Sequence, residues 1–170
     1  LYGDPDGAWR VMRFDPDSEL YQVIDQHPKV QTTERDLEAE VEAMERGLES
    51  YHPTPESFPD VLMGLEEFPG EKAIPGAGVG IGVQYRSQAW IEAVASRPDL
   101  IERWFDVQAE RAIRCVEAQS KLDVQVMLGG GDMATNLGPI YSPRAFREML
   151  MPRLARIVDA CHKHGKYYFF

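Results

Sequence analysis

Asp132 is the residue of this chain best placed for chemistry, because it follows three consecutive glycines, Gly129 to Gly131, after the apolar run Val124–Leu128. A carboxylate beside three glycines has few side chains nearby to pair with, so it can bind a cation, a pyrrole N–H or a polarised substrate. Aspartate after glycine is also common in turns and caps. We predict that Asp132 is catalytic and keep the turn residue as the alternative.

Four other polar residues are candidate substrate-binding groups. Gln84, Tyr85 and Arg86 follow a glycine-rich extended run, and Asn136 belongs to the same loop as Asp132. The planar fork of Arg86 suits an anionic substrate, and Tyr85 offers an apolar body with a polar tip. The structural alternatives are a salt bridge for Arg86 and a bond to the loop's own backbone for Asn136.

No metal site is predicted within the chain. Cys161, His162 and His164 lie close together, but they fall in the last turn of a predicted helix, where histidine and lysine complement the helix dipole. Cys115 and Cys161 both fall on apolar helix faces and fit small core residues in a reducing compartment. The two cysteines therefore exclude a disulfide scaffold, and we expect a cytoplasmic protein.

A strand, a turn and a long helix must position Asp132. The run 124–128 predicts a strand, and Ser142-Pro143 predicts a helix start whose stop is Gly165. Pro152 should kink this helix near Leu150. A new strand is predicted at 166–170, so the order is β, α, β, which implies a parallel pair.

The glycine-rich run 72–83 predicts a third strand, over 73–83. Its glycines recur at period two and so share one face of an extended segment, which indicates close approach of a helix, a strand or a ligand. The dinucleotide fingerprint G-x-G-x-x-G fails, because Ile81 and Val83 stand where its last glycine would be. Helices are predicted from Ser87 to about Ser96 and from Pro98 to about Lys121. Strands starting near 73, 124 and 167, each followed or preceded by helix, are typical of a barrel or a doubly wound sheet.

Residues 1–70 form a distinct acidic front. They hold 17 acidic and 5 basic side chains, a balance of −12, against 11 and 13 in residues 71–170. Two short runs, 8–14 and 20–24, predict a hairpin-like excursion between turn signals, and Thr33 should cap a helix through about Ser50. Residues 51–69 predict a loop with a helical turn or two around 61–68.

The composition bounds the class of partner. A net charge of −10 repels phosphate backbones and anionic lipid, so we expect neither nucleic acid nor membrane as a partner. With 44% hydrophobic residues and no run near the ~20 apolar residues of a membrane span, the chain should be a soluble globular domain. Because it begins at Leu1 and ends at Phe170 inside a predicted strand, we expect a piece of a longer protein, a single and incomplete domain.

The run from Gly138 to Lys166 resembles a known family. It contains Gly-Pro at 138–139, Ser-Pro at 142–143, Phe146, Pro152, and His-x-His-Gly-Lys at 162–166. This pattern is similar to that of uroporphyrinogen decarboxylase and its cobalamin-dependent methyltransferase relatives. The helix start Arg97-Pro98-Asp99-Leu100 is similar too, so the resemblance covers roughly residues 72–170 well and the front loosely.

The resemblance implies a (β/α)8 TIM barrel, of which this chain holds only the parallel strands near 73–83, 124–129 and 166–170. The family's substrate-binding arginine and aspartate would precede Leu1, and the zinc-ligating histidine and cysteine of the methyltransferase branch would follow Phe170. Val83–Gln88 departs from the tyrosine-containing, Met- and Gly-rich pattern of the decarboxylase branch. We therefore expect a methyltransferase-like enzyme acting on a small methylated compound with a corrinoid protein as partner, and a homodimer is compatible with it. The alternatives are uroporphyrinogen decarboxylation, which needs no cofactor, and a barrel that only binds a small ligand.

Overall fold

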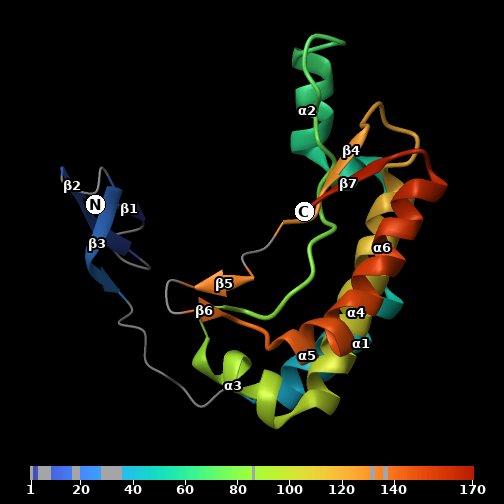
Figure 1. The fold of residues 1–170 in the computed structure, drawn as a ribbon. Coiled ribbons are helices and arrows are strands. Elements are labelled where there is room, and N and C mark those ends of the chain that lie inside the picture. The colour runs from blue at the N-terminus through green and yellow to red at the C-terminus, as the bar shows by residue number, and fades with distance from the viewer. Residues whose placement is uncertain are drawn as a thin grey trace. The chain divides into compact units, whose positions relative to one another are not determined.

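The computed structural model describes residues 2–3, 9–16, 20–27, 36–85, 87–130, 133–135 and 138–170. The chain divides into two compact units, Leu1–Arg35 and Asp36–Phe170. Figure 1 labels their helices and strands.

The first unit is a small antiparallel sheet. Strand β2 (Trp9–Asp15) pairs with β3 (Leu20–His27) and also with the short β1 (Tyr2–Gly3), and the register shifts between Val11 and Met12. The two longer strands confirm the predicted hairpin. Strand β1 was not predicted from the sequence.

The second unit begins with helix α1 (Leu37–Glu49), which starts later than predicted. Its N-cap is Asp36, whose carboxylate accepts a hydrogen bond from the N–H of Ala39 at 3.0 Å. The predicted cap, Thr33, lies outside the described residues. A 3-10 turn (Pro55–Ser57) and helix α2 (Pro59–Glu67) follow, which confirms helical structure around residue 61.

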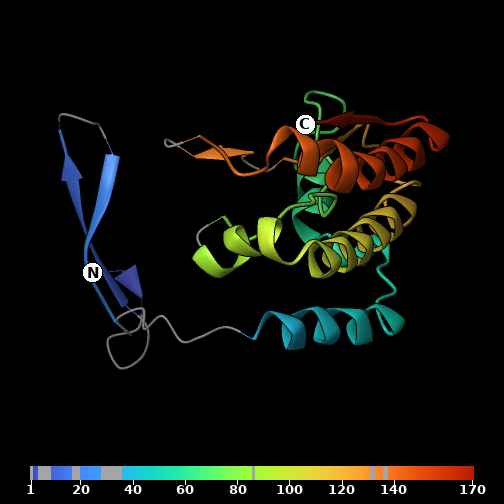
Figure 2. The same cartoon turned by 60° about the horizontal axis from the view of Figure 1, so that its bottom comes forward.

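Helix α4 (Pro98–Ala118) is the centre of the helical layer. It packs against α1, against α3 (Gln88–Ser96) and against α6 (Met151–Lys163). Figure 2 shows α4 between α1 on one side and α6 on the other. The predicted apolar stripe is confirmed by its buried residues, which are Leu100, Ile101, Trp104, Phe105, Val107, Ala109, Ala112, Cys115 and Val116.

Arginine side chains form ion pairs between α4 and two of its neighbours, α1 and α6. Arg103 on α4 pairs with Glu45 at 2.7 Å and also with Glu38, both on α1. Arg153 on α6 pairs with Asp106 on α4 through two nitrogens, at 2.9 and 2.8 Å. The ion pairs therefore hold the three helices in register on each other.

The long helix predicted from Ser142 to Gly165 is interrupted in the structure. The Ser142 hydroxyl accepts a hydrogen bond from Ala145 N–H at 3.1 Å, and Gly165 stops the helix with φ of +67°. Between these ends, the short α5 (Pro143–Ala145) passes into a π-helical turn (Phe146–Leu150) before α6 begins. Pro152 lacks an N–H, so the regular α-helical bonding breaks in the turn before it, as predicted.

Three segments lie side by side in the same direction, which confirms the central prediction about the sheet. Strand β4 (Val126–Leu128) pairs in parallel with β7 (Tyr167–Phe169). On the other side of β4, Gly76 forms a parallel bridge with Met127. The predicted extent of the first strand is wrong, because within 73–83 only Gly76 makes such a bridge. The second unit is thus a mixed α/β structure with a parallel pair, and the described residues do not form a barrel.

The two faces of this sheet differ in what covers them. In-register partners in a parallel pair point to the same face, so Met127 and Tyr168 share one face while Leu128 and Phe169 share the other. Met127 is fully buried among the helices, whereas Leu128 is 48% and Phe169 63% exposed, and Tyr167 is 70% exposed. The described residues of this unit cover only one face of the sheet.

A small hairpin follows β4. Strands β5 (Ala134–Thr135) and β6 (Gly138–Pro139) are antiparallel, and the N–H of Ile140 donates to the carbonyl of Met133 at 2.9 Å. Both views show this hairpin extending away from the helical layer (Figures 1 and 2). No helix in the described ranges is both long and apolar enough to cross a bilayer.

Candidate functional site

The candidate site lies at the carboxyl ends of the parallel segments, where ligands bind in parallel α/β sheets. A Cβ on Gly80 would lie 3.3 Å from the carbonyl oxygen of Gly130, so these two chain positions touch. Gly80 leads to Gln84 and Tyr85, and Gly130 leads to Asp132. The structure therefore brings together the two backbone segments that carry the predicted site residues.

Two of the five predicted site residues are described. Gln84 and Tyr85 are both exposed at the end of the glycine-rich segment, and Tyr85 has 43% of its surface accessible. Arg86, Asp132 and Asn136 lie outside the described residues. Their roles as substrate-binding or catalytic groups stay predictions.

The glycines of the segment 76–82 are contacted closely, as predicted, but they do not share one face of an extended strand, because Gly78 has φ of +79°. A Cβ on Gly76 would overlap the sulfur of Met127, and a Cβ on Gly82 would lie 3.3 Å from the hydroxyl of Tyr141. Strand β4 and the aromatic ring after β6 thus occupy the space that side chains would need. The glycines serve close packing within the chain.

The carboxyl end of the glycine-rich segment is held by three side chains. The N–H of Gly82 donates to Oε1 of Gln108 at 2.7 Å, while the carbonyl of Gly82 accepts from Nε2 of Gln108 at 2.9 Å and from Nε1 of Trp104 at 3.0 Å. The N–H of Val83 donates to the Tyr141 hydroxyl at 2.9 Å, and burial raises the pKa of that phenol. These bonds fix the backbone directly before Gln84.

The amino end of the same segment is held in the same way. The N–H of Ala77 donates to Oε1 of Gln119 at 3.0 Å, and Nε2 of Gln119 donates to the carbonyl of Ala77 at 2.8 Å. Gln119 is fully buried, so these bonds satisfy an amide that would otherwise be costly to bury. A primary amide here bonds to the backbone as a neighbouring strand would, and Gly78, with φ of +79°, interrupts the extended conformation directly after Ala77.

The two glutamines bind opposite ends of the segment. Gln108 bonds to Gly82, and Gln119, eleven residues later in the chain, bonds to Ala77, five residues earlier in the segment. The helix therefore runs antiparallel to the segment, with one amide at each end. Their positions on the apolar face of α4 were the signal in the sequence, since a buried glutamine needs a polar partner.

Tyr168 links all three parallel segments. Its hydroxyl donates to the carbonyl of Val79 at 3.2 Å, and its ring lies against Gly129 at the end of β4. Burial raises the pKa of Tyr168 to about 12, so the hydroxyl keeps its proton and remains a donor. This tyrosine stabilises the arrangement from which the site loops emerge.

The opposite, amino end of the sheet is held by a buried lysine. Lys166 is 6% exposed and its ammonium donates to the carbonyls of Val124 at 2.7 Å and Leu122 at 3.2 Å. Burial lowers the pKa of Lys166, and the charge of nearby Asp123 opposes that effect. Its contacts make it a support for the start of β4.

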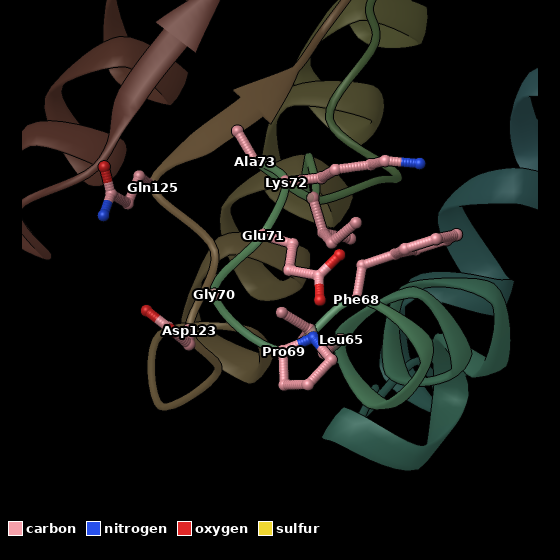
Figure 3. Close-up of a pocket in the computed structure, with 10 residues that line it drawn as sticks. Leu65, Phe68, Pro69, Gly70, Glu71, Lys72, Ala73, Asp123 and Gln125 are labelled. Atoms are coloured by element: carbon pink, nitrogen blue, oxygen red, sulfur yellow. The ribbon is translucent and has the colours of Figure 1, made fainter.

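A cavity of about 400 Å³ also lies at the amino end, beside α2. Figure 3 shows Lys72 and Glu71 extending on one side of it and Asp123 and Gln125 on the other, so their polar groups do not converge. The ammonium of Lys72 lies 3.8 Å from the centroid of the Phe68 ring. This cavity lacks the convergent polar groups of a binding site.

A second cavity, of about 380 Å³, lies between α2 and the glycine-rich segment. Its lining is mostly apolar or bare backbone, with Asp60 as its charged side chain. Neither of the two described site residues, Gln84 and Tyr85, lines either cavity. The lining comprises Asp60, Val61, Gly64, Ile74, Pro75, Gly76, Ala77, Gly78 and Leu128.

The cysteines are core residues. Both are buried with free thiols, and burial raises the pKa of Cys161 to about 11. Sγ of Cys115 lies 3.0 Å from the Tyr51 hydroxyl, and burial raises the pKa of the Cys115 thiol as well. A thiol that stays protonated is a poor nucleophile. Within the described ranges no three His, Cys, Asp or Glu side chains are grouped to hold a metal ion.

Comparison with known proteins gives no relative: no protein-family model, no curated protein and no solved structure matches the chain.

Proposed function

We propose that the chain is part of an enzyme of the uroporphyrinogen decarboxylase superfamily, and that this enzyme is a methyltransferase-like member acting on a small methylated compound with a corrinoid protein as partner. In this proposal the chain supplies consecutive βα units of a (β/α)8 barrel. Its cellular location is the cytoplasm.

The half-covered parallel sheet is the observation that carries the proposal. Parallel sheets are normally buried on both faces, yet Leu128, Tyr167 and Phe169 expose apolar surface on the face away from the helices. Among the described residues β7 pairs only with β4, so its other edge is open to a further strand. Closure into a barrel would bury this face and pair this edge.

The contacts of the family-like segment add support for the fold. Gly138 has φ of +141°, which favours glycine, and Ser142 and Gly165 begin and end the helical region. Lys166 holds two carbonyls before β4. Each of these residues has a structural reason for its identity, so the segment supports a barrel unit more strongly than it supports a particular reaction.

We assign the catalytic and substrate-binding residues to the carboxyl ends of the three parallel segments. Asp132 is the proposed catalytic carboxylate, and Tyr85 with Gln84, Arg86 and Asn136 would bind the substrate. The proposal assigns no zinc ligands to the residues of this chain, because in the methyltransferase branch that the run 138–166 resembles they would follow Phe170. Zinc bound there would activate a thiol acceptor for methylation.

The proposal is tested with the full-length protein that contains this chain. Purified protein should contain zinc and transfer a methyl group between a methylated donor, a corrinoid protein and a thiol. An Asp132→Asn variant should lose most turnover while its thermal unfolding stays unchanged. Metal-free, folded protein without methyl turnover would contradict the proposal.

Assays on the same purified protein distinguish two alternative functions. Release of carbon dioxide from uroporphyrinogen would identify a decarboxylase, for which the exposed Tyr85 at the carboxyl end is a candidate substrate contact. Saturable binding of a small ligand without turnover would identify a non-catalytic barrel.

A further inference from the structure

We propose that Gln108 is a positioning residue for the site loop, defined here as Gln84 and Tyr85. Its side-chain amide fixes Gly82 and thereby sets the direction in which the chain enters this loop. The functional part of this inference rests on the proposed function, because it takes the site loop as part of the substrate site.

The geometry singles out Gln108 from the other contacts at this end. It is the side chain that binds both polar groups of Gly82, with N···O distances of 2.7 and 2.9 Å, whereas Trp104 binds only the carbonyl. A primary amide has an acceptor and two donors, so it can pair with a peptide group as a neighbouring strand does. Gln108 therefore fixes the orientation of the peptide groups on both sides of Gly82.

The position of Gly82 makes this fixation matter for the loop. Only Val83 stands between it and Gln84, and the N–H of Val83 is held in turn by Tyr141. The N–H of Ser87, the N-cap of α3, donates to the carbonyl of Gln84 at 2.9 Å. The loop is thus tied through Gly82 to α4 and through Gln84 to the start of α3, which itself packs on α4.

The chain offers a matched control in Gln119. It makes the same two-point contact with the backbone, from the same helix, but at Ala77, five residues before Gly82. A general loosening of α4 against the segment would follow from replacing either glutamine. A positioning role for Gln108 predicts that only its own replacement frees the site loop.

Amide hydrogen exchange measures the positioning directly. In folded Gln108→Met, exchange should rise by roughly 10-fold or more at the two bonded amides that flank the loop, Val83 and Ser87. In Gln119→Met the increase should appear at Ala77 and not at Val83 or Ser87. Unchanged exchange at Val83 and Ser87 in folded Gln108→Met, or an equal rise there in Gln119→Met, would overturn the proposal.

A conservative variant distinguishes loss of the Gln108 hydrogen bonds from general unfolding. Gln108→Glu keeps an acceptor for the Gly82 N–H and regains a donor when the carboxyl group is protonated, at about pH 4 and below. Protection of the Val83 and Ser87 amides should therefore be higher at acid pH than at neutral pH in this variant, and the wild type should lack this difference. Equal protection factors at both pH values would contradict a role for the amide bonds.

Kinetics of the full-length protein test the functional part. With the methylated donor and corrinoid protein, Gln108→Met should lower kcat/KM by roughly 10-fold or more, an effect expected when a site is misplaced. Gln119→Met should leave kcat/KM within about 2-fold at a temperature where it is folded. Hydrogen exchange could change as expected while neither the wild type nor any variant transfers methyl groups. That result would support the positioning role of Gln108 and contradict the proposed function.

Discussion

Tyr168 and Gly129 lie so close across the parallel pair that no side chain fits at position 129. A Cβ built on Gly129 would overlap the Tyr168 hydroxyl and its ring, while the same atom on the neighbouring Gly130 would meet nothing within 4 Å. Tyr168 is held in that place by its bond to the carbonyl of Val79.

Replacing Gly129 by alanine should therefore destabilise the protein. The methyl group must displace the Tyr168 ring and break its bond to Val79, at a cost of about 1–3 kcal/mol in the free energy of unfolding. Urea unfolding measures this cost, and Gly130→Ala is the matched control, with an expected change within about 0.5 kcal/mol. Equal effects of the two substitutions would contradict the contact.

Replacing Gln119 by methionine should destabilise the protein by about 1–2 kcal/mol, because it removes the two hydrogen bonds that this fully buried amide makes with the backbone of Ala77. Methionine preserves the volume of the side chain, so a cavity does not explain the loss. The exposed Gln125 supplies the control, and Gln125→Met should change the free energy of unfolding by less than about 0.5 kcal/mol. A neutral Gln119→Met would show that other groups satisfy Ala77.

Much of the helical structure could be predicted from sequence because its signals are local. Ser142 and Gly165 mark helix ends through their own side chain or backbone, and Pro152 disturbs the helix through its own ring. Thr33 misled the prediction of α1, because Asp36 supplies an equally good cap three residues later. The start of a helix with several candidate caps depends on which one its packing selects.

The glycine-rich segment and the site were less predictable for a different reason. The period of its glycines predicted close approach correctly, yet its partners, Gln108 and Gln119, come from a helix 26 and 42 residues further along the chain. Their amides replace a strand ladder, which no pattern within 73–83 can indicate. Gln84 and Tyr85 were located from their place after this segment, and Tyr141 and Trp104, which hold it, were assigned no such role.

The stability of the protein should fall above pH 10 in a way that depends on Tyr168. Its pKa is raised to about 12 by burial, from a usual value near 10. The folded state thus holds a proton that the unfolded state loses, so this stabilisation is present below about pH 10 and is lost as the pH rises towards about 12. Burial of Cys161 acts in the same direction and is common to the variants.

Urea midpoints measured from about pH 9 to about pH 11 test this dependence. Tyr168→Phe should be less stable than wild type at neutral pH, because the bond to Val79 is gone, but its midpoint should fall less steeply with pH. Phe169→Leu, which changes the next residue of β7 and adds no titrating group, should keep the slope of wild type. Parallel curves for wild type and Tyr168→Phe would contradict the raised pKa.

Replacing Arg153 by lysine should cost about 1 kcal/mol in the free energy of unfolding, because lysine cannot form the two-point contact with Asp106. The Arg153 side chain is 13% exposed and also donates to the carbonyl of Met149 at 3.2 Å. Each of its three guanidinium nitrogens therefore has a hydrogen-bond acceptor. Chemical denaturation measures the loss.

Arg144→Lys is the control for Arg153. Its guanidinium pairs with Glu148 but is 82% exposed, so the expected cost is below about 0.5 kcal/mol. If Arg153→Lys costs no more than Arg144→Lys, the contact between α6 and α4 does not depend on the shape of the guanidinium.

The most direct test of the account is an experimental structure of the full-length protein that contains this chain. We predict that the open edge of β7 pairs with a further parallel strand, and that Leu128, Tyr167 and Phe169 then lie buried inside a closed barrel with Tyr85 and Asp132 at one rim. A structure in which β7 remains an edge strand, pairs antiparallel, or leaves these three side chains in solvent would contradict the barrel and the enzyme family proposed from it.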